Sequence, residues 1–194
     1  LMLTMGFTWL SPVQAAEPAA PTFQLLDTIA VGGEGRWDYL CVDAQAQRLY
    51  IPRSTHVQVL NLLNHKILAD ILGTNGVHGV ALAPEQNLGF TSNGKANTVS
   101  VFDLKTFQVT NTIPTGKNPD AIIYDPASKH IFAFNHTGGD ITVIDPADLP
   151  KPPVTIAVGG TLEYAVADGA GHVFVCIEDK NEIVQIDTKA KTVL

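Results

Sequence analysis

Residues 88–103 read LGFTSNGKANTVSVFD and contain two short β-type runs, 88–91 and 98–102, on either side of Asn93 and Gly94. The runs are rich in valine, phenylalanine and threonine, and apolar and polar residues alternate along the second run. An Asn-Gly pair between two such runs is a strong hairpin signal. This stretch therefore predicts two antiparallel strands joined by a tight turn.

The same pattern returns along the chain with a period of about 42 residues, and three columns of residues keep that period. The columns are Asn61, Asp103, Asp145 and Asp187; Ile29, Ile71, Ile113 and Ile156; and Tyr50, Phe90, Phe132 and Phe174. Self-similarity at a fixed period is the signature of a repeat architecture. We therefore expect four copies of one structural unit.

Each copy divides into four β-type runs separated by turn residues. One four-stranded sheet of this size cannot bury both of its faces, whereas sheets stacked around an axis can. The sequence thus predicts an all-β fold, a β-propeller of four-stranded antiparallel blades, with a solenoid of such units as the alternative. The expected blades are 37–72, 77–113, 119–158 and 162–194, the last one incomplete.

The N-terminal segment is expected to lie outside the propeller. Residues 1–15 are predicted to be a secretory signal with a clipped front, because an apolar stretch precedes the small residues Val13 and Ala15. Residues 16–22 form an Ala/Pro linker, and residues 22–31 resemble a lone fourth strand that would close the ring against its last blade. The predicted location is the periplasm or the outside of the cell.

Charge and hydropathy exclude some partners. The formal net charge of -7 argues against broad affinity for nucleic acid or for anionic membranes. No segment after the signal is long and apolar enough to span a bilayer, so we expect no membrane span in the mature chain. Cys41 and Cys176 occupy non-equivalent places in the repeat, and we interpret both as small buried apolar residues.

Over residues 23–194 the repeats resemble the YVTN-type (YncE-like) family of bacterial β-propellers. The matching stretches are 48–51 (RLYI), 88–93 (LGFTSN), 98–103 (TVSVFD) and 112–119 (TIPTGKNP), whereas the strict Tyr-Val-Thr-Asn string is absent. The resemblance implies an exported, seven-bladed propeller, of which this chain would hold about four blades. It also brings single-stranded nucleic-acid binding as an alternative function, which the acidic charge opposes.

The entry loops of the innermost strands are where a propeller is expected to bind ligands, because they reach the mouth of the central channel. Aligning the four entries places Asp38, His78, Asp120 and Glu163 at one equivalent position. Such a ring could hold a divalent cation or a cationic or polar organic molecule. The alternative is structural, with these side chains capping turns and holding neighbouring blades in register.

A second ring is expected at the ends of the second runs: Arg53, Asn93 and Asn135, with Ser54, His136 and Glu178 beside them. Arg36 and Arg53 could bind an anion or pair with a blade carboxylate such as Asp38. Trp37 and Tyr39 could offer an aromatic face, although packing between blades is the favoured interpretation of both. The predicted ligand-binding set is Arg36, Trp37, Asp38, Arg53, His78, Asn93, Asn118, Asp120, Asn135, Glu163 and Glu178.

No nucleophile elbow, phosphate-binding loop or haem-attachment motif occurs in the sequence. We therefore predict an exported propeller that binds a small ligand or a protein partner without turnover. The alternatives are a metal-assisted hydrolase or lactonase-type enzyme and, by fold analogy, a quinoprotein dehydrogenase-like subunit. A divalent cation is the one cofactor that the predicted ring suggests.

Overall fold

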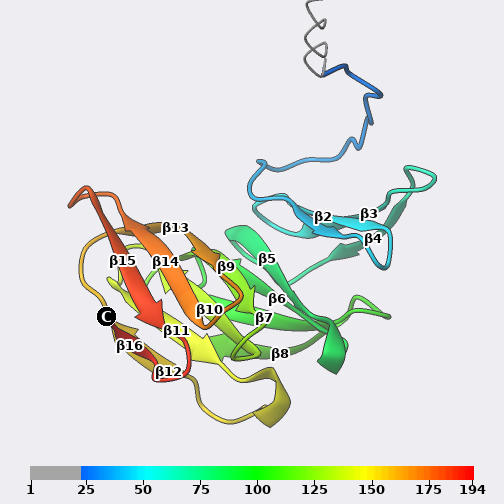
Figure 1. The fold of residues 1–194 in the computed structure, drawn as a ribbon. Coiled ribbons are helices and arrows are strands. Elements are labelled where there is room, and N and C mark those ends of the chain that lie inside the picture. The colour runs from blue at the N-terminus through cyan, green and yellow to red at the C-terminus, as the bar shows by residue number, and fades with distance from the viewer. Residues whose placement is uncertain (1–22) are drawn as a thin grey trace, which may run out of the picture. The chain divides into compact units, whose positions relative to one another are not determined.

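The computed structural model describes residues 23–194, in which residues 23–30 belong to a separate unit and residues 31–194 carry all the strands. Four antiparallel four-stranded sheets follow one another along the chain (Figure 1). The prediction of an all-β fold with four-stranded antiparallel blades is confirmed.

The strands of blade 1 are β1 (Cys41–Asp43), β2 (Arg48–Pro52), β3 (Val57–Asn61) and β4 (Ile67–Ile71). Blade 2 contains β5 (Val77–Ala83), β6 (Leu88–Asn93), β7 (Thr98–Asp103) and β8 (Val109–Pro114). Blade 3 contains β9 (Pro119–Asp125), β10 (His130–Asn135), β11 (Asp140–Ile144) and β12 (Val154–Ala157). Blade 4 contains β13 (Leu162–Ala167), β14 (His172–Ile177), β15 (Glu182–Asp187) and β16 (Thr192–Val193).

Helical structure in the described part of the chain is confined to two short 3-10 segments, η1 (Pro84–Gln86) and η2 (Pro146–Asp148). Neither approaches the length or the hydropathy of a membrane-crossing helix, and no other helix occurs in residues 23–194.

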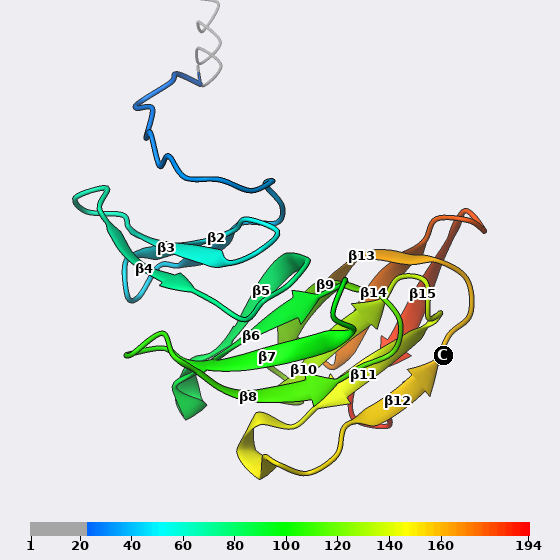
Figure 2. The same cartoon turned by 180° about the vertical axis from the view of Figure 1, so that it is seen from behind.

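The blades are arranged so that their first strands are neighbours. Within each sheet the four strands pair in chain order. Strand β5 lies against β1 on one side and β9 on the other, and β9 in turn lies against β13. The first strands are therefore innermost and the fourth strands outermost, as the view from behind shows for blades 2 and 3 (Figure 2). This arrangement brings the blade entries together.

The Asn/Asp column has a local cause that the structure makes plain. Asp103 Oδ1 accepts hydrogen bonds from the backbone N–H groups of Lys105 (2.8 Å) and Thr106 (2.7 Å). Asn61 and Asp187 each accept two such bonds at the equivalent turns. Each side chain caps the turn between the third and fourth strands of its blade, because short Asx side chains readily bond backbone amides two or three residues ahead.

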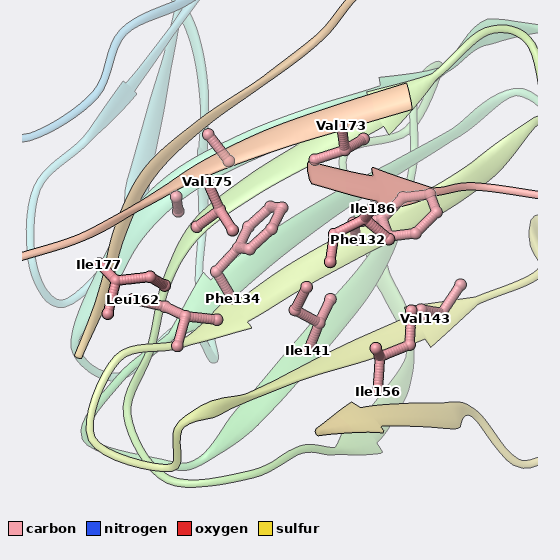
Figure 3. Packing of buried hydrophobic residues seen from close by; sticks show 12 residues of the cluster. Phe132, Phe134, Ile141, Val143, Ile156, Leu162, Val173, Val175, Ile177 and Ile186 are labelled. Carbon is pink, nitrogen blue, oxygen red and sulfur yellow. The ribbon is translucent and has the colours of Figure 1, made fainter. Parts of the chain in front are cut away.

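The aromatic column forms the cores between blades. Tyr50, Phe90 and Phe132 are completely buried, each in a different interface. In the interface between blades 3 and 4, Phe132 and Phe134 lie with Val173 and Val175 in one cluster (Figure 3). Because each blade buries one sheet face on the next, the hydrophobic period of the sequence becomes a stack of apolar interfaces.

One glycine is required by close packing in the blade 1–2 core. A Cβ atom on Gly89 would lie 2.1 Å from the ring of Phe102, which packs against Tyr50 with ring centroids 5.9 Å apart. No side chain larger than hydrogen fits at this position without moving the aromatic ring.

Three sequence expectations are corrected or fall outside the description. Residues 23–31 form no strand beside the four described blades, and the pairing expected for residues 22–31 with the last blade of the ring stays a prediction. The two cysteines are not both buried: Cys41 is half-buried and Cys176 is exposed, since Cys176 lies on the face of β14 against which no other blade packs within residues 31–194. The signal predicted over residues 1–15 and most of the linker lie outside the described residues.

Candidate ligand site at the channel mouth

Side chains from the first three blade entries meet at the mouth. Asp38 precedes β1, His78 lies in β5 and Asp120 lies in β9, and all three are half-buried. The Nδ1 atom of His78 lies 2.8 Å from Asp38 Oδ2 and 3.7 Å from Asp120 Oδ2. One imidazole therefore bridges two carboxylates from the neighbouring blades.

Glu163, the fourth entry residue, belongs to a different cluster. Its Oε1 atom accepts a hydrogen bond from the Tyr39 hydroxyl at 3.0 Å, and its Oε2 atom lies 3.4 Å from His136 Nε2. The same His136 nitrogen lies 3.3 Å from Glu178 Oε1. The structure thus does not gather the predicted cation ligands Asp38, His78, Asp120 and Glu163 into one coordination shell.

The two clusters are nevertheless coupled through Asp120. Burial raises the pKa of Asp120 above its usual value, and the nearby carboxylates of Glu163 and Asp38 raise it further, against the opposing effect of His78. Burial also raises the pKa of Tyr39, and Asp120 and Glu163 add to that shift. The mouth therefore concentrates acidic groups, and each carboxylate raises the pKa of the titratable group beside it.

Space for the His78 ring comes from a glycine on blade 2. A Cβ atom on Gly94 would lie 2.7 Å from His78 Nε2 and 2.4 Å from Asn118 Oδ1. Gly94 follows the last residue of β6, at the place that Ser54 and His136 take in blades 1 and 3. A side chain there would displace either the imidazole or the amide.

Two cavities open beside these clusters. One of about 410 Å³ lies between the entries of blades 1 and 2 and is lined by Arg36, Trp37, Asp38, Ser54, Gly76, Val77, His78 and Lys95. Another, of about 270 Å³, is lined by the four innermost strands, including Tyr39 and Tyr164, whose ring centroids are 5.8 Å apart. A cavity of a few hundred Å³ is the size that small organic ligands occupy.

Arg53, which the sequence analysis placed in the ligand set, is a structural residue. It is only 2% exposed, and its guanidinium donates hydrogen bonds to Gln58 Oε1 (2.6 Å) and to the carbonyl oxygens of Gly32 (2.7 Å) and Gly33 (3.2 Å). It also lies 4.0 Å from the centroid of the Trp37 ring. Arg53 therefore fixes the loop that carries Trp37.

Asn93 and Asn135 are likewise completely buried. Asn93 Nδ2 donates to Ser100 Oγ at 2.8 Å, and Asn135 Nδ2 donates to Thr142 Oγ1 at 2.9 Å. Both amides tie the end of the second strand to the third strand of the same blade. Asn118 is half-buried, with its backbone oxygen accepting a hydrogen bond from the backbone N–H of His136.

Three residues at the mouth, His136, Tyr39 and Lys95, are not in the ligand set predicted from the sequence. His136 was noted only beside Asn135, Tyr39 was considered only as an aromatic face, and Lys95 was not selected. The column one residue beyond Asn135 pointed to His136, since it also contains Glu178. No repeat column signalled Tyr39, which reaches Glu163 of blade 4 from blade 1.

Comparisons with known proteins agree with the fold. No protein-family model matches the chain. Over 63 residues the chain is 41% identical to Antigen Lp49 of Leptospira interrogans, a match that covers 32% of this chain and 14% of that protein.

Similar solved structures extend over most of the chain. Hydrazine synthase of Kuenenia stuttgartiensis aligns with a TM-score of 0.73 and 16% identity, covering 88% of this chain and 51% of that chain. The dihydro-heme d1 dehydrogenase NirN in complex with DHE aligns with a TM-score of 0.65 and 12% identity, covering 83% and 36%. The shared fold is a β-propeller. The present chain spans about half or less of each of these proteins.

Proposed function

We propose that this propeller is exported and acts as a binding scaffold without turnover, taking a small zwitterionic ligand such as an amino acid at its mouth. The proposal rests on the lining of the 410 Å³ cavity, which presents both signs of charge beside an aromatic face. The apolar stretch and small residues within positions 1–15 support export.

Charged groups in the cavity match the two ends of a zwitterion. Asp38 Oδ2 contacts His78, and Oδ1 accepts a hydrogen bond from the backbone N–H of Tyr39. Each carboxylate oxygen keeps a further lone pair that can accept from a ligand ammonium group. Arg36 and Lys95 line the same cavity, and neither forms an ion pair within residues 23–194. A ligand carboxylate would therefore meet unpaired cations, which bind it more strongly than neutral donors do.

Trp37 supplies the apolar part of the site. The residue is 57% exposed even though Arg53 lies over the ring. An exposed indole held by a buried guanidinium gives a rigid surface for the body of a ligand, at low cost in conformational entropy.

Three probes with one indole body test this proposal by isothermal titration: L-tryptophan, tryptamine and indole-3-propionate. We expect L-tryptophan to bind most tightly, because it alone satisfies both charge types. Asp38→Asn should weaken L-tryptophan and tryptamine by about tenfold and leave indole-3-propionate unchanged. Arg36→Gln combined with Lys95→Gln should show the converse.

The matched control is Asp70→Asn, which removes the same charge on β4, the outermost strand of blade 1. Equal weakening by Asp70→Asn and Asp38→Asn would reduce the effect to net charge and contradict the proposed site. Failure of all three probes to bind in the millimolar range would also overturn it.

A further inference from the structure

We infer that His136, Glu163 and Glu178, at the junction of blades 3 and 4, bind a divalent transition-metal ion of the zinc type. These three residues are not part of the proposed zwitterion site, so the two proposals are independent. It also differs from the cation set expected from the aligned entries, of which only Glu163 takes part.

Two of the three donor–donor distances match those of a coordination shell, and the third pair of donors lies within 4.8 Å. Nε2 of His136 lies 3.4 Å from Glu163 Oε2 and 3.3 Å from Glu178 Oε1, and the three ligand atoms all lie within 4.8 Å of one another. Donors held about 2.0–2.2 Å from a tetrahedral zinc ion are separated by about 3.3–3.6 Å. One ion can therefore reach all three atoms with little rearrangement.

Backbone hydrogen bonds hold the positions of the three residues. The backbone N–H of His136 donates to Asn118 at 2.8 Å, and the His136 carbonyl accepts from Leu162 at 3.3 Å, beside Glu163. The backbone N–H of Glu178 donates to Thr161 at 3.0 Å. The bond between Leu162 and His136 joins blades 4 and 3, whereas the other two bonds lie within blade 3 and within blade 4, so both the blades and their interface position the three ligands.

Tyr39 orients one ligand from outside the shell. Its hydroxyl donates to Glu163 Oε1, which leaves Oε2 directed at His136. Carboxylates and imidazoles that bind metals are commonly fixed in this way by an outer hydrogen bond. The Tyr39 hydroxyl therefore fixes the orientation of Glu163 without being a ligand of the ion.

The ligand charges are not balanced by the protein. One ring nitrogen faces two glutamates, and a single N–H can donate to only one of them. Within residues 23–194, no lysine or arginine forms an ion pair with Glu163 or Glu178. The other ring nitrogen, His136 Nδ1, is buried and has no hydrogen-bond partner in the described structure. A dication between the three groups would relieve the repulsion between the carboxylates.

The donor set selects the class of ion. One imidazole nitrogen with two carboxylate oxygens suits zinc, manganese or cobalt better than calcium, which prefers six to eight oxygen ligands. The Glu178 side chain is 53% exposed, so solvent has access to the remaining coordination positions.

Titration of the chelator-stripped full chain with zinc chloride, monitored by calorimetry, tests the inference. Cobalt(II) chloride gives a second readout through its visible absorption, whose intensity reports the coordination geometry. We expect one ion per chain, weakened by more than about 100-fold in His136→Gln and Glu178→Gln. In Tyr39→Phe, which removes only the outer hydrogen bond, the expected loss is about tenfold. Calcium chloride should bind far more weakly than zinc chloride.

Glu182→Gln is the matched control, because Glu182 is an exposed glutamate on the same blade outside the cluster. Glu178→Gln alters an exposed side chain, so its fold can be verified by circular dichroism in chelator. The inference fails if neither ion binds stoichiometrically, or if binding survives both ligand variants. Binding that is lost in His78→Gln instead would assign the ion to the other cluster. Because the indole probes are titrated in chelator, this test and that of the zwitterion site fail separately.

Discussion

Blades 3 and 4 carry the same aromatic column in two different environments. Phe132 of blade 3 is completely buried against blade 4, whereas Phe174 of blade 4 is only partly buried. Its neighbours on the same face, Cys176 of β14 and Ile183 of β15, are exposed. Equivalent positions in a repeat therefore contribute unequally to stability, because the contribution depends on whether another blade lies on that face.

The largest test of this difference is truncation of the aromatic column. We expect Phe132→Ala to lower the free energy of unfolding by about 3–5 kcal/mol, because it leaves a cavity in a closed core. Phe174→Ala should cost about 1–2 kcal/mol, since part of that ring remains in water. Urea denaturation of both variants measures the two values. Equal losses would mean that the open face of blade 4 is covered in solution.

The second comparison concerns the end of the second strand, which has a buried amide in blade 2 and an aliphatic side chain in blade 4. Asn93 of blade 2 donates to Ser100, and its Oδ1 accepts from Thr91. Blade 4 has Ile177 at this position, also buried. Asn93→Ala should lower the free energy of unfolding by about 1–3 kcal/mol, because it removes partners from buried hydroxyl groups. Asn111→Ala, on outer strand β8, should change it by less than about 0.5 kcal/mol.

Asp103 of blade 2 and Asp120 of blade 3 should have opposite effects on the stability of the fold as the pH changes. Burial raises the pKa of Asp120, so its ionised form opposes folding above that raised value. Hydrogen bonds from the Thr106 and Lys105 amides lower the pKa of Asp103, so its ionised form favours folding.

We expect Asp120→Asn to raise the melting temperature at pH 7 and Asp103→Asn to lower it. The Asp120 difference should fade as the pH falls from its raised pKa to the ordinary value of 3.8, whereas the Asp103 difference should persist down to 3.8 and fade as the pH falls through its lowered pKa. Melting curves between pH 3 and pH 8 provide the comparison. A lower melting temperature for Asp120→Asn at pH 7 would show that its carboxylate is needed to hold His78.

The smallest expected effect concerns the two thiols, whose reactivity with iodoacetamide tests how exposed each one is. Burial, with a further contribution from Asp43, raises the pKa of Cys41 to about 11, so about one molecule in a thousand carries the thiolate at pH 8. Cys176 is exposed. Iodoacetamide at pH 8 should label Cys176 in the folded protein and Cys41 only after unfolding, as mass spectrometry of wild type and Cys176→Ser would show. Fast labelling of Cys41 would contradict a closed first blade.

Several features of the site were predictable because they repeat. The alignment of blade entries selected Asp38, His78 and Asp120, which the structure brings together through the His78 imidazole. It could not show that Arg53 turns inward, because a lone arginine in a column of asparagines carries no sign of the backbone carbonyls it binds. The contact of Tyr39 with Glu163 was also invisible, since it joins blades 1 and 4 across 124 residues of sequence.

The sequence by itself determined the local units: strand lengths, the turns capped by the Asn/Asp column, and the hydrophobic face of each blade. These depend on interactions between residues close in the chain, so their period is legible without coordinates. The tertiary structure decided which carboxylates share an imidazole and which of them remains beside Tyr39 and His136. Those pairings depend on how far each blade is rotated against the next, which is fixed by side-chain packing between blades and by no local pattern.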